Sequence, residues 1–132
     1  MSGPTLRGLV GLVVARSLRL LLVEDHPDSA ELLAELLESK GHTVRIAATV
    51  SDALACAAEE TFDLVVSDVG LPDGSGYELM QKLRDRFALK GIALTGTRMT
   101  DAMADSGFIA FLTKPIALRT LEQTLENVAR GL

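Results

Sequence analysis

The chain has 132 residues, of which 48% are hydrophobic and 23% charged, so it is long and apolar enough for a single folded domain and is not a disordered tail. A formal net charge of -5 without any run of Lys or Arg excludes a broad basic surface, and we expect no nucleic acid partner. The single cysteine, Cys56, excludes an internal disulfide. The apolar stretch at residues 9–15 is too short to cross a bilayer, so we predict a cytoplasmic protein without a membrane partner.

The first predicted unit is a buried strand followed by a helix. Residues 18–23 form a nearly continuous apolar run, which is typical of a strand covered on both faces, and Glu24 and Asp25 end it abruptly. Pro27 suits the first turn of a helix. Alanine and leucine then repeat at helical spacing up to Gly41, where a glycine suits the end of a helix.

The second predicted unit repeats this order. Residues 43–47 read as a strand, and an alanine-rich helix follows that continues to Glu60. Thr49 and Asp52 have the spacing of a capping box at the start of this helix, in which the threonine side chain accepts a hydrogen bond from a backbone N–H group of the first turn. The alternation of strand and helix is therefore regular over the first half of the chain.

The third predicted unit contains a clear buried strand. Residues 62–67 are an apolar run rich in β-branched side chains, and the run stops at Asp68. A loop follows, in which Gly74 and Gly76 are interpreted as ordinary turn glycines. Ser75 has an acid three residues later, so it is the predicted cap of the next helix.

The last part of the chain contains two more predicted strands and a closing helix. Residues 91–95 and 108–112 are short apolar strands, whereas residues 96–106 between them are polar and irregular. The fourth helix is therefore expected to be shortened or irregular. After Pro115, leucine and valine residues fall on one face of a closing helix.

Together these units predict an α/β fold. Five strands that alternate with helices form a doubly wound parallel five-stranded sheet, a (βα)5 arrangement with strand order 2-1-3-4-5. The predicted domain covers residues 18–132, and residues 1–17 are a linker or an N-terminal extension. In such a sheet, ligands bind outside the carboxyl ends of the strands at the point where the strand order reverses.

The unusual polar residues of the sequence follow predicted strands. Glu24 and Asp25 follow the first strand, Asp68 the third, Thr95 the fourth and Lys114 the fifth. Because the first and third strands are neighbours, we expect Asp25 and Asp68 to approach each other closely. Uncompensated carboxylates would raise one another's pKa, whereas a hard divalent cation would hold them ionised. Carboxylate and carbonyl oxygens with open water positions suit Mg²⁺, so one Mg²⁺ is predicted here.

These residues, in this order, resemble the receiver domain of two-component response regulators, which has a CheY-like, flavodoxin-like fold. The resemblance rests on Glu24 and Asp25, on the run from Asp68 to Gly76, on Thr95 and on Lys114 with Pro115, and it covers the chain from about residue 18 to the end. It implies that Asp68 is the phosphoacceptor, which takes a phosphoryl group from a sensor histidine kinase or a phosphotransfer protein. An unknown downstream protein would read the phosphorylated state. The turn at residues 72–76 is similar to receivers attached to hybrid sensor kinases.

The resemblance also implies a metal site. Asp25, Asp68 and the carbonyl of Gly70 would bind Mg²⁺ directly, and Glu24 would act through a bound water. The chemistry needs such a site, because a carboxylate nucleophile must be ionised and repulsion from the incoming phosphate must be cancelled. His26 and His42 lack metal-ligand spacing and are given no role.

Further roles implied by the resemblance concern the phosphoryl group. Thr95 and Lys114 would contact its oxygens. An ammonium group that is already in place stabilises the negative charge of the phosphoryl group during transfer. Phe111 stands where many family members carry a switch tyrosine, and its ring has no hydroxyl, so the switch is expected to be looser or rewired. The peptide bond before Pro115 is a candidate for the cis isomer.

Two other functions stay open at this stage. One is a docking module of the same fold that works without phosphorylation, which the shortened fourth segment makes conceivable. The other is a metal-dependent phosphohydrolase that uses Asp68 as a transient nucleophile, although Gly70 stands where such enzymes need a second acid. The favoured prediction is a switch that catalyses only its own phosphorylation and dephosphorylation.

Overall fold

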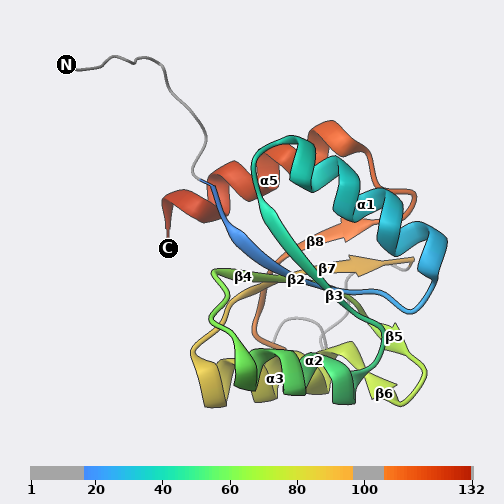
Figure 1. Ribbon diagram of the computed structural model, residues 1–132, viewed down its shortest axis with the longest axis vertical. Helices are drawn as coiled ribbons and strands as arrows, with labels where there is room; N and C mark the ends of the chain where they lie inside the picture. The colour runs from blue at the N-terminus through green and yellow to red at the C-terminus, as the bar shows by residue number, and fades with distance from the viewer. Residues whose placement is uncertain (1–16, 97–105, 132) are drawn as a thin grey trace.

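In the computed structural model, which describes residues 17–96 and 106–131, five parallel strands form a single sheet with helices on both faces (Figure 1). In space the strands follow the order β3-β2-β4-β7-β8, which is the predicted 2-1-3-4-5 order of a doubly wound sheet. The five strands are β2 (Arg19–Val23), β3 (Thr43–Ala47), β4 (Leu64–Asp68), β7 (Gly91–Thr95) and β8 (Phe108–Thr113). The predicted fold class is therefore confirmed.

Two pairs of helices enclose the sheet. Figure 1 shows α1 (Pro27–Ser39) and α5 (Leu118–Arg130) on one face, with α2 (Val50–Glu59) and α3 (Gly76–Phe87) on the other. Each face has its own core. Alternate residues of β2 belong to different cores, since Leu20 and Leu22 pack with α1 and α5 whereas Leu21 and Val23 pack with α2 and α3. This two-sided burial explains why the strand reads as a continuous apolar run.

The helix caps agree with the sequence in one case and differ in another. The Thr49 side chain accepts a hydrogen bond from the Asp52 backbone N–H at 3.0 Å, as the capping box predicts. The Ser75 side chain caps α3 but accepts from Tyr77 at 3.1 Å, one residue earlier than the spacing with Glu78 predicts. Its cap therefore serves the second residue of the helix.

The segment after Asp68 is more ordered than a plain loop. It contains a small antiparallel hairpin of β5 (Gly70–Leu71) and β6 (Gly74–Ser75). Asp73, at the turn of this hairpin, accepts hydrogen bonds from the backbone N–H groups of Val50 and Ser51 at 2.8 and 3.1 Å. The hairpin is thereby fixed to the first turn of α2, and these bonds lower the pKa of the Asp73 carboxyl group.

Gly76 is not the ordinary turn residue that the sequence suggested. A Cβ atom at this position would lie 2.2 Å from the carbonyl oxygen of Asp68, which is far inside van der Waals contact. The Gly76 N–H group donates to the carbonyl oxygen of Val69 at 2.8 Å. The start of α3 is therefore pressed against the backbone that carries Asp68, and only a glycine fits there.

Two predictions fall outside the described residues. The shortened or irregular fourth helix lies at residues 97–105, and most of the predicted N-terminal linker or extension lies at residues 1–16. Among the helices of the two described ranges, none combines the length and apolarity needed to span a membrane.

Candidate functional site

The residues singled out in the sequence gather at the carboxyl ends of the strands. Glu24 and Asp25 directly follow β2, and Asp68 and Thr95 are the last residues of β4 and β7. Single ligand atoms from Glu24, Asp25, Asp68 and the neighbouring His26 all lie within 4.8 Å of one another. The acids of two neighbouring strands are therefore brought together as the predicted strand order requires.

Lys114 faces these acids from the end of β8. Its Nζ atom lies 2.6 Å from Oδ1 of Asp68 and 3.7 Å from Oε1 of Glu24. The Lys114 backbone N–H donates to the carbonyl oxygen of Thr95 at 2.8 Å, which continues the pairing of β8 with β7 beyond the strand. The peptide bond between Lys114 and Pro115 is cis.

Burial controls the charges of the site. Asp68 is only 3% exposed, and burial together with the hydrogen-bonded Glu24 raises the pKa of Asp68 to about 7 despite the nearby ammonium group. Burial acts on Glu24 in the same direction, but its hydrogen bond with Asp68 and the charge of Lys114 lower the pKa of Glu24 overall. Burial opposes the charge of Lys114 as well, yet its contacts with the two acids raise its pKa. The negative charge of Asp68 is therefore unfavourable in this buried site, and the Lys114 ammonium offsets only part of that cost.

The donor set fits a hard divalent cation. Glu24 Oε2 is buried and has no hydrogen-bond partner among the described residues, which is costly for a carboxylate oxygen. A cation that is coordinated by Asp25 and Asp68 with Glu24 nearby would offset this cost, and oxygen donors of this kind suit Mg²⁺. Gly70 lies in β5, two residues beyond the buried aspartate, and its carbonyl as a ligand stays a prediction.

His26 lies at the site although the sequence analysis assigned it no role. Its side chain is 73% exposed, and its Nδ1 atom lies 3.5 Å from Oδ1 of Asp25 and 3.6 Å from Oε2 of Glu24. His26 is the residue before α1, so it follows the acids directly in the chain. His42 lies elsewhere and accepts a hydrogen bond from the backbone N–H of Leu18 at 3.1 Å, which is a structural contact.

Thr95 has a partner that the sequence analysis missed. The threonine is 2% exposed, and its side chain is hydrogen-bonded to the hydroxyl of Tyr77, in the first turn of α3. Phe111 lies nearby in an aromatic row, since its ring packs edge-on against Phe108 at 6.0 Å, and Phe108 packs edge-on against Tyr77 at 6.1 Å. The one signal available beforehand was that Tyr77 is the only tyrosine of the chain.

The strand order and the acidic site beside a lysine define a CheY-like α/β domain. The family model of the response regulator receiver domain matches residues 20–126, and the chain therefore belongs to this family of two-component signalling domains. The resemblance in the sequence is thereby confirmed.

Several known proteins are similar to this chain. The sensor histidine kinase RcsC of Salmonella typhimurium is 34% identical over 110 residues, which are 80% of this chain but only 12% of the kinase. An uncharacterised 14.6 kDa protein of Leptolyngbya boryana is 39% identical over 103 residues, 74% of this chain and 79% of that protein. Among solved structures, a CheY-like receiver domain from Methylobacillus flagellatus matches with a TM-score of 0.79 at 30% identity, covering 86% of this chain and 99% of that one.

Proposed function

We propose that this receiver domain is a phosphorylation switch in which Asp68 accepts a phosphoryl group from a phosphohistidine of a sensor histidine kinase or a phosphotransfer protein. One observation carries the proposal: the buried Asp68 carboxylate lies beside the carboxylates of Glu24 and Asp25 and 2.6 Å from the Lys114 ammonium. A carboxylate beside other acids can bind a metal ion together with them. A cation already placed nearby offsets the negative charge of the incoming phosphoryl group.

Each residue of the site has its own role in the phosphoryl transfer. An Oδ atom of Asp68 attacks the phosphorus, the bond from phosphorus to the donor imidazole nitrogen breaks, and the imidazole leaves with that electron pair. Lys114 faces the charge on the equatorial oxygens, since its ammonium is already directed at Asp68. Asp25, Asp68 and the Gly70 carbonyl, with Glu24 acting through a water, would hold Mg²⁺, whose positive charge would keep the Asp68 nucleophile ionised.

Phosphorylation then changes what the domain binds. The new phosphoryl group adds three acceptor oxygens and negative charge beside Thr95 and Lys114, which favours a second arrangement of the loops that carry them. Water later removes the group from Asp68. The domain therefore acts as a switch for a partner protein and not as an enzyme on other substrates.

Intact mass spectrometry tests this function. Wild-type protein is incubated with acetyl phosphate and Mg²⁺, beside Asp68→Asn and a sample with EDTA. We expect a single phosphoryl adduct in the wild type and none in either control. An adduct of equal size on Asp68→Asn would contradict the assignment, and failure of folded, Mg²⁺-binding wild type to form any adduct would favour a docking module that works without phosphorylation.

A further inference from the structure

The hydroxyl that Phe111 lacks is present on another aromatic residue beside Thr95. Tyr77 lies in the first turn of α3, directly after Gly76, whose backbone is pressed against Asp68. Its hydroxyl is hydrogen-bonded to the Thr95 side chain. The chain has no second tyrosine, so no other phenol can replace it.

The bond to Tyr77 holds Thr95 on one side of the sheet. Ala93 packs in the core shared with α2 and α3, and Leu94 packs in the opposite core. Because side chains alternate along a strand, Thr95 leaves β7 on the α3 side. Val66 belongs to the core of α1 and α5, and the same alternation places Asp68 on that opposite side. To reach a phosphoryl group on Asp68, the Thr95 hydroxyl must therefore turn away from Tyr77.

The two contacts compete for the same hydroxyl group. A threonine hydroxyl has one proton to donate, and phosphoryl oxygens only accept hydrogen bonds. Burial raises the pKa of Tyr77, and the hydrogen bond with Thr95 opposes this rise, so the two hydroxyls are in direct contact. Resting on the proposed function, we propose that Tyr77 is a positioning residue whose hydroxyl holds Thr95 in the unphosphorylated arrangement and competes with the phosphoryl group for it.

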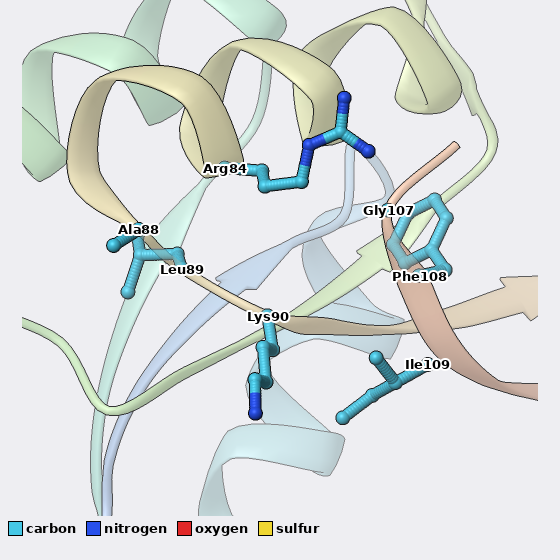
Figure 2. A pocket seen from close by; sticks show the side chains of 7 residues that line it. All are labelled: Arg84, Ala88, Leu89, Lys90, Gly107, Phe108 and Ile109. Carbon is cyan, nitrogen blue, oxygen red and sulfur yellow. The ribbon is translucent and has the colours of Figure 1, made fainter. Parts of the chain in front are cut away.

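Release of the hydrogen bond between Tyr77 and Thr95 would also affect residues outside the site. The Tyr77 ring meets Phe108 edge-on, with an interplanar angle of 81°. On the side shown in Figure 2, Phe108 lines a groove of about 590 Å³ between the end of α3 and the start of β8, together with Arg84, Leu89 and Ile109. The row of Tyr77, Phe108 and Phe111 thus connects Thr95 to the surface groove, so a movement of Tyr77 would alter the surface around Phe108.

Binding of beryllofluoride, an anion that mimics a phosphoryl group on a carboxylate, tests the proposal. With Mg²⁺ present, ¹⁹F NMR of the bound anion gives its affinity for the wild type, Tyr77→Phe, Thr95→Ala and the double variant. Tyr77→Phe keeps the ring and removes the competing hydroxyl, so it should bind the anion roughly two- to tenfold more tightly. In the Thr95→Ala background, the same substitution should change nothing. Thr124→Val, which removes an exposed hydroxyl bonded within α5, is the matched control and should bind like the wild type.

The outcomes separate this inference from the proposed function. Unchanged or weaker binding by Tyr77→Phe, with normal binding by the wild type, overturns the role of Tyr77 alone. Failure of the folded wild type to bind the anion overturns the proposed function and this inference with it. A second readout uses the single tyrosine: its fluorescence should change as the wild type binds beryllofluoride and stay constant as Thr95→Ala binds it. Constant fluorescence in the saturated wild type would contradict release of the Tyr77 hydroxyl.

Discussion

The buried carboxylate of Asp68 should make the metal-free protein less stable as pH rises. Asp68→Asn removes the charge and keeps the size of the side chain, with an NH2 donor in place of one carboxylate oxygen. We therefore expect the variant to be more stable than the wild type at pH 8 in EDTA, although it has lost an ion pair with Lys114. Loss of a close ion pair would ordinarily destabilise a protein, so the expected sign is informative.

The magnitude follows from the pKa of the buried group. Burial raises the pKa of Asp68 from 3.8 to about 7. Between these values the folded protein holds a proton that the unfolded chain has released, so stability is present at low pH and falls as pH rises. Each pH unit in this interval corresponds to about 1.4 kcal/mol. From pH 5 to pH 8, the wild type should therefore lose about 3 kcal/mol relative to Asp68→Asn.

Urea unfolding at both pH values, in EDTA, measures this difference directly. The comparison with Asp68→Asn cancels the titration of the groups that lie away from Asp68, whereas Glu24 and Lys114 titrate together with it. Addition of Mg²⁺ at pH 8 should restore the wild type by about 3 kcal/mol at a hundredfold excess over its Kd, with a smaller gain for the variant. A stability difference between the two proteins that does not change with pH would refute the reasoning.

Three further predictions concern neighbouring residues. Gly76→Ala should destabilise the protein by about 3 kcal/mol in urea, because its Cβ would meet the Asp68 carbonyl, whereas Gly74→Ala should stay within about 0.5 kcal/mol. Equal effects of the two would contradict the close approach. Asp73→Asn should lower the urea midpoint more at pH 7 than at pH 3, since backbone N–H groups lower its pKa and its contribution is lost as the carboxylate is protonated; a pH-independent effect would exclude this cap. Lys114→Met should reduce the acetyl phosphate adduct at least tenfold by intact mass, and unaltered uptake would remove the ammonium from the mechanism.

The sheet and its acidic edge were predictable because they depend on short sequence patterns. Buried parallel strands read as apolar runs, and β2 and β4 are buried on both faces. Once the strand order is known, the carboxyl ends of the strands share one edge, so Glu24, Asp68 and Lys114 must lie close together. The proximity of the site residues therefore follows from topology and needs no knowledge of individual side-chain conformations.

The contacts that were missed depend on the paths of loops. The choice of Tyr77 as the partner of the Ser75 cap, the Asp73 contacts and the close approach at Gly76 all arise from the hairpin of β5 and β6, whose two-residue strands leave no periodic signal. Tyr77 meets Thr95 because this hairpin places the start of α3 against Asp68. His26 reaches the acids for a similar reason, since its position is set by the turn between β2 and α1.

Chemical mapping of the phosphorylated residue tests the central claim most directly. Borohydride reduces an aspartyl phosphate to homoserine, so the wild type is treated with acetyl phosphate and Mg²⁺, reduced, digested and sequenced by tandem mass spectrometry. We predict homoserine at position 68 and at no other aspartate, and none when EDTA is present. Homoserine at Asp25 or at another acid, with an unmodified Asp68, would contradict the account.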